Sequence, residues 1–431
     1  MPFRFCPQCG TKLQPDFRFC PSCGEKLPCP VYESEPVSTT PSLSLFPAKR
    51  DEALTSVVKS SLATSSSCER RFACQKPCPV HCPVTPQDSV SESQDRKGKA
   101  KKAKHAPTVE PLRENEEVTD TTGKKWKLEK LLSQSTTELI YEVLQTVSRS
   151  NSKESNHILK LGAKDGRIFN EQNFLQRAAK PASVDKWIKQ NKMDFLGIPS
   201  CVGFGLHAES YRFLIFPNMG QSLQSVMEEE DELLSEKAVL QLACRILDVL
   251  QYIHSNEYVH ADINAENIYI KPGQKSQVYL VGYCHAFRYC PGGQHVEYRE
   301  ASRTPHEGTM EFISLDAHKG AAPSRRSDLQ SLGYCMLRWH AGTLPWALLA
   351  QPDQVATQKQ RYMEDVPALL SHCFGKKRVS SAFQTYLTEV MTMQYSEQPD
   401  YSLLKAGLSA ALLQLGGNTL RESLFLTLTQ G

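Results

Sequence analysis

Four cysteines near the N-terminus have the residue type and spacing of a metal site. Cys6 and Cys9 return fourteen residues later as Cys20 and Cys23, within the matching stretches FRFCPQCGTKL and FRFCPSCGEKL. Each Cys-Pro-x-Cys-Gly predicts a tight turn, whose glycine can take a positive φ. Four thiolates suit a tetrahedral structural zinc with no open position. We therefore expect residues 1–27 to form a zinc ribbon that folds with its metal; the alternative is a flexible tail with free thiols.

A second group of polar residues lies in the stretch HADINAENIYI, residues 260–270. Asp262 and Asn267 have the spacing that protein kinases use for a proton-accepting aspartate and a metal-holding asparagine. In such an enzyme the next strand ends in Asp-Phe-Gly, whose aspartate holds magnesium. Here Gly282-Tyr283-Cys284 stands in its place. The loop therefore indicates a kinase-like fold, whereas the following strand argues against phosphoryl transfer.

Further landmarks of a kinase-like fold follow in the expected order. Lys160 ends the predicted strand HILK, and Glu171 is expected to open the next helix, as in the pair that holds nucleotide phosphates. Met219 ends the stretch FPNM, a candidate hinge between two lobes, and Asp328 precedes a long helix under the catalytic loop. Each landmark alone is weak, but their order predicts a protein-kinase-like domain.

Three stretches resemble the vaccinia-related kinases, relatives of the casein-kinase-one branch. They are NEQNFLQRAAKP (170–181), TPHEGTMEFISLDAHKG (304–320) and PSRRSDLQSLGYCMLRWHAGTLPW (323–346). The resemblance covers residues from about 122 to 415. It implies a two-lobed fold and, for active members, phosphorylation of Ser/Thr on nuclear and chromatin proteins such as barrier-to-autointegration factor. The predicted zinc ribbon, the basic segment at residues 96–105 and the altered catalytic motifs resemble those of the family's pseudokinase member.

The first departure from the family pattern lies in the phosphate-binding hairpin. The resemblance aligns LLSQSTTELIYEV with the glycine-rich loop, which places Ser133, Ser135 and Glu138 where three glycines belong. Side chains there obstruct the close approach of backbone amides to the phosphates. Glu138 would also bring a carboxylate beside the triphosphate, and two like charges about 4 Å apart repel by about 4 kcal/mol at an effective dielectric of 20. The alternative is that the hairpin flexes and Glu138 points to water.

The second departure concerns the metal and the transferred phosphate. Gly282 stands where the magnesium-holding aspartate belongs, and the single amide of Asn267 is a poor ligand for a metal that prefers anionic oxygens. Asn264 replaces the lysine that usually follows the catalytic aspartate, which removes a cation near the phosphate. We therefore expect that ATP and magnesium are not bound productively.

Two retained or altered positions allow more than one interpretation. Tyr269 follows Asn267 by two residues, where kinases usually place an aliphatic residue under the adenine. Its ring either fills the base pocket or packs into the lobe. Asp262, with Lys160 and Glu171, is either a working base or a structural relic. Together with the departures, these residues predict impaired catalysis.

The elements that position these residues are predicted from hydrophobic periodicity. Strand-like runs lie at 126–132, 139–145, 157–161 and 211–216, around one helical pattern at 170–179. Helical patterns follow at 235–254, 327–339, 381–393 and 401–415. Strands first and helices afterwards predict an α+β domain with two lobes. We place this domain at residues 123–415, with a C-terminal tail at 416–431.

Residues 28–122 are rich in Ser, Thr, Pro and charge, which predicts a disordered linker. Its segment RKGKAKKAKH (96–105) is typical of a nuclear localisation signal, and it lacks aromatic residues that would stack on bases. Its cations are Arg96, Lys97, Lys99, Lys101, Lys102 and Lys104. Four more cysteines have irregular spacing that matches no zinc module, which favours solvated thiols over the alternative of a second metal site: Cys68, Cys74, Cys78 and Cys82.

Composition narrows the classes of function that remain. The net charge of +3 is too small to identify a nucleic-acid binder. The sequence contains no run of about 18 apolar residues, so no membrane span is predicted. The N-terminus lacks the apolar core of a secretion signal, so fifteen cysteines are expected to be reduced.

The sequence favours a nuclear pseudokinase that acts as a scaffold or allosteric regulator, with a signalling kinase or phosphatase as protein partner. One alternative is a weak Ser/Thr kinase on nuclear or chromatin proteins. A second is a nucleic-acid-associated adaptor that uses the ribbon and the basic linker.

Overall fold

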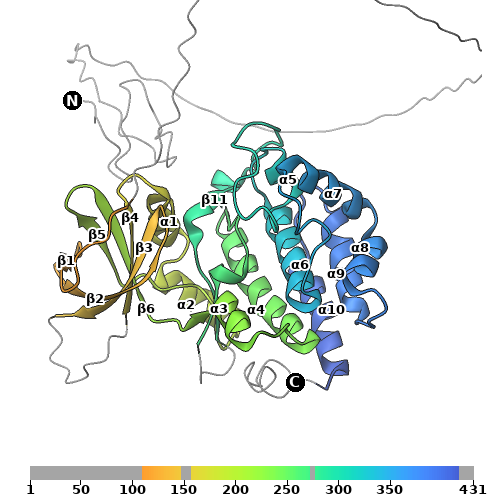
Figure 1. The fold of residues 1–431 in the computed structure, drawn as a ribbon, viewed down its shortest axis with the longest axis horizontal. Coiled ribbons are helices and arrows are strands. Elements are labelled where there is room, and N and C mark those ends of the chain that lie inside the picture. The colour runs from red at the N-terminus through yellow and green to blue at the C-terminus, as the bar shows by residue number, and fades with distance from the viewer. Residues whose placement is uncertain (1–108, 147–156, 272–276, 417–431) are drawn as a thin grey trace, which may run out of the picture.

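The computed structural model describes residues 109–146, 157–271 and 277–416 (Figure 1). The predictions for the zinc ribbon, the basic segment 96–105, the four irregularly spaced cysteines and most of the tail lie outside the described residues. Within these residues, the chain forms one lobe around a sheet and a second lobe of helices, side by side in Figure 1. The predicted α+β architecture with two lobes is confirmed.

An antiparallel sheet forms the first lobe, with the strand order β1-β2-β3-β4-β6-β5. Phe213 and Ile215 of β6 pack around Trp126 on one face, while Leu214 and Phe216 join the cluster that contains α1 on the other face. The alternation follows from the two-residue period of a strand. The elements are β1 (Glu117–Thr119), β2 (Lys125–Gln134), β3 (Glu138–Gln145), β4 (His157–Ala163), α1 (Arg167–Arg177), β5 (Gly203–His207) and β6 (Tyr211–Pro217).

The folded domain starts earlier than the predicted boundary at residue 123. Val109 is buried, and β1 pairs with β2 although it lies inside the segment predicted as linker. The buried carboxylate of Asp120 organises this start: Oδ2 accepts a hydrogen bond from Trp126 Nε1 at 2.9 Å, and Oδ1 accepts one from Thr122 N at 2.8 Å. The sequence of this segment resembles a linker because the polar residue Asp120 stabilises the turn and β1 has only three residues.

Helices form the second lobe, and those predicted from periodicity are present with end points shifted by a few residues. Five further helices were missed, of which α3 (Leu223–Glu230) and α5 (Leu315–His318) are short and the other three each have a proline in the first turn: α2 (Pro181–Gln190), α7 (Pro352–Glu364) and α8 (Val366–Phe374). The others are α4 (Glu236–Ser255), α6 (Arg325–Ala341), α9 (Ser381–Thr392) and α10 (Tyr401–Gln414). Among the described helices, none has the length and apolar character of a membrane span.

Short strands and turns between the lobes carry the candidate site. β9 (Ile268–Ile270) pairs with β10 (Val278–Leu280) and with β7 (Gln221–Ser222), while β8 (Tyr258–Val259) pairs with β11 (Phe287–Arg288). Two single-turn 3-10 helices, η1 (Ala265–Asn267) and η2 (Tyr283–His285), lie next to these strands. A third, η3 (Pro291–Gly293), follows β11. These pairings fix the catalytic-type loop and the Gly282-Tyr283-Cys284 turn relative to each other.

Asp328 at the start of α6 holds the loop in place. Its carboxylate is fully buried and accepts hydrogen bonds from His260 N at 2.7 Å, Ala261 N at 2.8 Å and His254 Nε2 at 2.8 Å. Ala261 has a φ of +67°, a conformation that costs energy for a residue with a side chain. The hydrogen bonds to Asp328 offset this cost, so the loop shape depends on one carboxylate.

We expect Asp328→Ala to lower the free energy of unfolding by about 3–5 kcal/mol, because it leaves buried donors without an acceptor. Urea denaturation of the full chain at neutral pH would measure the loss. Asp353→Ala on α7 is the matched control, since that side chain is 97% exposed and should change the free energy by about 0.5 kcal/mol or less. Equal effects of the two changes would contradict the anchoring role.

Candidate functional site

A cleft of about 710 Å³ lies between the two lobes. Its walls come from the β2–β3 hairpin, from β4, from the segment after β6, from α3, and from the η1–β9 and Val281–Gly282 stretches. Most predicted site residues line it, namely Ser133, Ser135, Glu138, Lys160, Glu171, Met219, Asn267, Tyr269 and Gly282. Asp262 and Asn264 are not among the lining residues.

The ammonium group of Lys160 is the electrostatic centre of the cleft. Its Nζ lies 2.8 Å from Glu171 Oε2 and 3.0 Å from Glu138 Oε2, and the Lys160 side chain is 13% exposed. Burial opposes the charge, yet the neighbours Cys284, Glu171 and Glu138 raise the pKa of Lys160 well above its usual value. Burial likewise opposes ionisation of Glu171, but Lys160 holds the pKa of that carboxyl below its ordinary value. Lys160 is therefore a cation bound by two carboxylates of its own chain.

The positions of the two carboxylates differ from the sequence-based picture. Glu171 lies in the second turn of α1, which begins at Arg167, and does not open the helix as predicted. Glu138 points toward the cleft rather than into water, because β3 pairs with β4 in a register that sets Ile140 opposite Lys160. The Glu138 side chain thus occupies space next to the lysine that would hold a phosphate.

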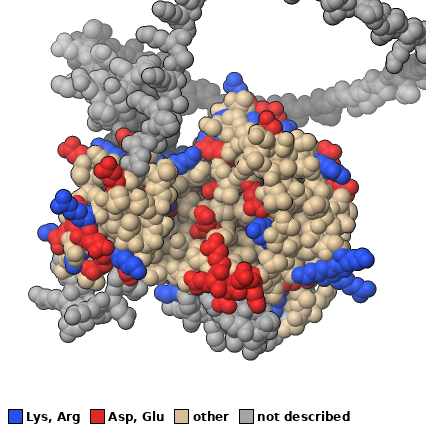
Figure 2. All heavy atoms as spheres, viewed as in Figure 1, with Lys and Arg blue, Asp and Glu red and all other residues tan. Residues whose placement is uncertain are grey.

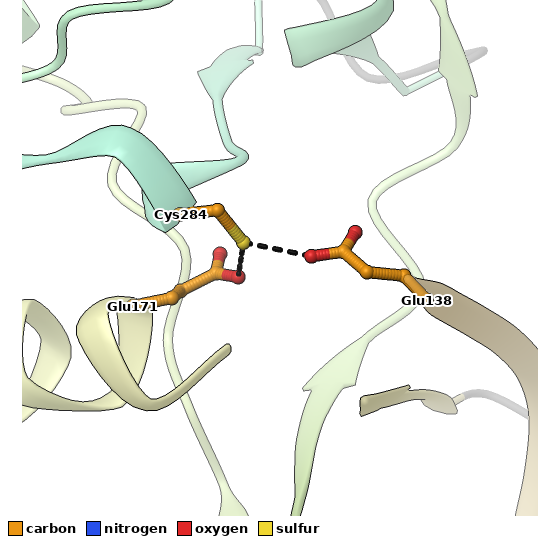
Figure 3. Close-up of side chains that lie close together, drawn as sticks. All are labelled: Glu138, Glu171 and Cys284. Atoms are coloured by element: carbon orange, nitrogen blue, oxygen red, sulfur yellow. Dashed lines mark hydrogen bonds between the residues drawn. The ribbon is translucent and has the colours of Figure 1, made fainter. Parts of the chain in front are cut away.

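Cys284 completes this cluster and was not assigned a role from the sequence. Its Sγ lies 2.8 Å from Glu138 Oε1 and 3.2 Å from Glu171 Oε2, so the single thiol proton is shared between the two carboxylates (Figure 3). Burial, then Glu171, raises the pKa of the Cys284 thiol well above its usual value, so the thiol keeps its proton and acts as a donor. The only sequence signal was the replacement of the third motif position by a small polarisable residue.

Glu138, Glu171 and Cys284 also have the residue types of a metal site, and their ligand atoms lie within 4.8 Å of one another. However, Lys160 Nζ contacts all three side chains, including Cys284 Sγ at 3.2 Å. The positive charge that these groups need is thus supplied by the lysine.

Gly282 adopts a backbone conformation that a side chain rarely takes, with φ of +78° and ψ of +44°. A Cβ atom at this position would lie 2.1 Å from Asn267 Oδ1. Asn267 is in turn fixed by its amide, which donates to the carbonyl of Asp262 at 2.9 Å. An aspartate at residue 282 therefore does not fit unless Asn267 gives up this hydrogen bond.

Tyr283 and the helix α1 lock the neighbouring turn. The Tyr283 ring is fully buried and stacks on Phe174 of α1, with ring centres 3.9 Å apart. It also packs edge-on against His260 at 4.8 Å, and its backbone N donates to Glu171 Oε1 at 3.2 Å. These contacts join α1, the turn and the catalytic-type loop through side chains of the chain itself.

Backbone amides of the β2–β3 hairpin donate hydrogen bonds within the hairpin itself. Ser135 Oγ accepts hydrogen bonds from Glu138 N at 3.0 Å and from Thr137 N at 3.3 Å. In a glycine-rich loop such amides face the phosphates. Here the serine side chain takes them, so it replaces a phosphate-binding surface with an internal turn.

Asp262 lies outside the cleft and is engaged by Thr309. Its Oδ1 accepts hydrogen bonds from Thr309 N and Thr309 Oγ1, both at 2.8 Å. Asn264 donates to Thr309 Oγ1 at 3.0 Å and accepts from Asn267 N at 3.1 Å. The asparagine thus contributes hydrogen bonds but no charge at the position of the usual lysine.

Tyr269 forms part of the wall of the cleft. It belongs to β9, where it pairs with Ser222 and Tyr279, and its half-buried ring packs against the main apolar cluster. Burial raises the pKa of its hydroxyl. The ring leaves a cavity of about 710 Å³ open, with Met219 and Phe216 in the same wall.

Comparison with known proteins identifies the family. The protein kinase domain family matches residues 167–402, and a zinc-ribbon domain family matches residues 5–27. Serine/threonine-protein kinase VRK3 of Mus musculus is 41% identical over 433 residues, which cover 95% of this chain and 96% of that protein. The chain belongs to the vaccinia-related kinase family. The resemblance inferred from three short stretches is therefore confirmed.

Two further similarities agree with the vaccinia-related kinase assignment. Serine/threonine-protein kinase VRK3 of Homo sapiens is 48% identical over 313 residues, covering 72% of this chain and 66% of that protein. The solved structure of vaccinia related kinase 3 superimposes with a TM-score of 0.66 at 46% identity, covering 72% of this chain and 94% of that one. The zinc-ribbon match confirms the predicted ribbon as a domain, and zinc binding itself stays a prediction.

The geometry around Gly282 generates a test with a matched control. We expect Gly293→Ala to lower the free energy of unfolding by about 1–2 kcal/mol through its φ of +82° alone, because nothing lies within 4 Å of the added Cβ. Gly282→Ala has nearly the same φ and should cost about 1–3 kcal/mol more, because Asn267 must move.

Adding Asn267→Ala to Gly282→Ala should remove most of this extra cost, which urea denaturation of the four chains in a double-mutant cycle would measure. Independent effects of the two changes would mean that Asn267 does not close the position.

Proposed function

We propose that this member of the family is a pseudokinase, impaired in nucleotide binding and phosphoryl transfer, that works through protein contacts. The observation that carries the proposal is the saturation of Lys160 by Glu138 and Glu171. An incoming phosphate would have to displace Glu138 from the lysine and then remain close to that carboxylate. Like charges about 4 Å apart repel by about 4 kcal/mol at an effective dielectric of 20.

Three other features act on the same phosphates and support the proposal. The cleft is lined by five glutamates and one lysine, which is the wrong balance for a triphosphate. The hairpin amides of Thr137 and Glu138 are already used by Ser135. Gly282 supplies no carboxylate for magnesium, and Asn264 supplies no cation. Because these groups would act together, repair of one recovers little.

The scaffold part of the proposal rests on the intact remainder of the fold. The helical lobe has a continuous apolar core, and α1 is held by contacts to Lys160, Cys284 and Tyr283 of the same chain. A fold that is held together in this way presents a surface of fixed shape, which is suited to a protein partner. We propose that this partner is a signalling kinase or phosphatase. Chromatin-associated proteins are a further candidate class, and neither nucleic acid nor membrane is proposed as the main partner.

The N-terminal region adds localisation and a metal to the proposal. We propose a structural zinc held by Cys6, Cys9, Cys20 and Cys23, for which the ribbon match gives support. We also propose that the basic segment 96–105 directs the chain to the nucleus.

A weak Ser/Thr kinase is the second candidate, and one observation favours it. Asp262 keeps an ordered position, with two hydrogen bonds from Thr309 next to the catalytic-type loop. The relatives' names describe serine/threonine-protein kinases. Phosphoryl transfer would then proceed with Asp262 as the base and Lys160 freed from Glu138.

Nucleotide binding and turnover test the two candidates directly. We expect ATP with magnesium to leave the melting temperature of the full chain unchanged, whereas occupancy at 100 times Kd would stabilise it by about 2.7 kcal/mol. We also expect radiolabel transfer to a basic nuclear protein to equal that of Asp262→Asn, which serves as the blank for contaminating kinases. Gly282→Asp and Glu138→Gly should not raise it. Labelling by the parent well above this blank would establish the weak kinase instead.

Nuclear accumulation should depend on the five lysines Lys97, Lys99, Lys101, Lys102 and Lys104. Replacing them with Gln removes the charge that an import receptor recognises, and fluorescence microscopy of the tagged full chain should show it spread into the cytoplasm. The control replaces five exposed lysines of the folded domain with Gln: Lys186, Lys189, Lys192, Lys376 and Lys377. Both variants remaining nuclear would refute the localisation signal.

A further inference from the structure

A continuous acidic surface extends from the cleft across the end of α3. Residues 228–232 are five consecutive exposed acidic residues, of which Glu228 and Glu229 also line the cleft. Glu266 of η1 adds a carboxylate to the same cavity. Figure 2 shows acidic side chains gathered in the middle of this face, over the region of α3 in Figure 1. We call Glu228, Glu229 and Glu266 the acidic floor of the cleft.

The local partners of the acidic floor do not neutralise it. Glu228 accepts a hydrogen bond from the Gln224 amide at 2.6 Å, and Glu229 accepts one from the Gln221 amide at 3.2 Å. These amides orient the carboxylates but leave their charge. Among the described residues that line the cleft, Lys160 is the one cation, and it is bound by Glu138 and Glu171. A hollow with low-dielectric walls and one sign of charge attracts ligands of the opposite sign.

The chain enters the folded domain at the turn of the β2–β3 hairpin, whose other face lines the cleft. Val109 N donates a hydrogen bond to Thr136 O at 3.4 Å, in the turn of the hairpin whose neighbours Ser135 and Glu138 line the cleft. Leu112 then continues along β3, where its N donates to Tyr141 Oη at 2.8 Å. Val109 itself packs in the apolar cluster around Trp126, on the sheet face away from the cleft, so the residues before it would reach the cavity by passing around the hairpin turn.

The segment immediately before this entry point carries the opposite charge. Lys104 precedes Val109 by five residues, which span at most about 17 Å, and Arg96 precedes it by thirteen residues, which span at most about 45 Å. Gly98, Ala100 and Ala103 alternate with the cations, so the segment is slim enough for a narrow cleft. The segment 96–104 is thus long enough to reach the acidic floor and carries the opposite charge.

We propose that the basic segment 96–104 docks into the acidic cleft of its own chain. Single exposed ion pairs are weak, but a short tether gives the segment an effective concentration in the millimolar range, so several weak pairs suffice. Docking brings the cations of the segment next to Glu228, Glu229 and Glu266. High salt weakens the docking, because dissolved ions screen the attraction between exposed charges, with a screening length of about 10 Å at 0.1 M ionic strength.

This docking does not depend on the loss of catalysis, and its consequence rests on the localisation signal proposed above. Its consequence is competition, because the same six cations cannot lie in the cleft and bind an import receptor at once. The cleft would then regulate access to the localisation signal.

Zero-length crosslinking of the full chain at low salt tests the docking. A water-soluble carbodiimide joins a lysine amine to a carboxylate only where the two are in contact, and mass spectrometry identifies the joined peptides. We expect amide bonds between the lysines at 99–104 and the acidic floor. Replacing Glu228, Glu229 and Glu266 with Gln should lower the yield of crosslinks to the segment about tenfold, because three exposed ion pairs of ordinary strength are lost together.

The control variant removes the same charge elsewhere on the folded domain. It carries Gln at Glu209, Glu364 and Glu389, which are exposed on the β5–β6 turn, on α7 and on α9. This variant should crosslink like the parent. Crosslinks that persist in the acidic-floor variant, or that fall equally in both variants, would overturn the proposal.

Two further outcomes are informative. A mixture of nitrogen-15-labelled and unlabelled chains reports the origin of each crosslink, and pairs that join labelled to unlabelled peptides would show a second copy as the occupant and overturn docking within the chain. Failure of the pseudokinase proposal is seen separately, as ATP binding or turnover. The two proposals therefore stand or fall by different measurements.

Discussion

A buried ammonium group must be matched by negative charge, and this constraint shapes the whole centre of the molecule. Lys160 meets it with Glu138 from β3 and Glu171 from α1, while the Cys284 thiol of η2 bridges the two carboxylates. Since these groups come from four elements, β3, β4, α1 and η2, the match also fixes where the elements lie. The hairpin is drawn over the cleft, and α1 is drawn toward the Gly282-Tyr283-Cys284 turn. Stacking of Tyr283 on Phe174 adds an apolar contact at the same junction.

The altered positions form a rebuilt site rather than a set of missing parts. A glycine-rich loop would leave its backbone amides free to bind phosphate, whereas here Ser135 accepts hydrogen bonds from two of them. At the position where an aspartate would hold a metal, Gly282 lets the backbone pack closely against Asn267. Asn264 keeps the hydrogen bonds of the loop while it gives up a charge. Each replacement satisfies its neighbours, which is the expected result when a buried polar group loses its ligand and must find another partner.

Much of this arrangement could be predicted from the sequence, and the parts that could not share a physical cause. The long strands and helices follow from hydrophobic periodicity, and Lys160, Glu171 and Asp328 from their order along the chain. The contacts of Cys284 and the direction of Glu138 depend on a register between strands and on elements more than a hundred residues apart. The positive φ of Gly282 also depends on its surroundings. β1 was missed because three residues carry too little periodicity, and its turn depends on the side chain of Asp120.

The setting of α1 has a consequence for how such a protein could be controlled. The helix is held by Lys160, Cys284 and Tyr283, all from the same chain. With nucleotide binding impaired as proposed, the surface around this helix would have the same shape when the cell is energy-rich and when it is starved. Under the proposed function, its occupancy would follow the abundance, compartment and covalent state of the protein partner. The fold would report which proteins are present and not how much fuel the cell holds.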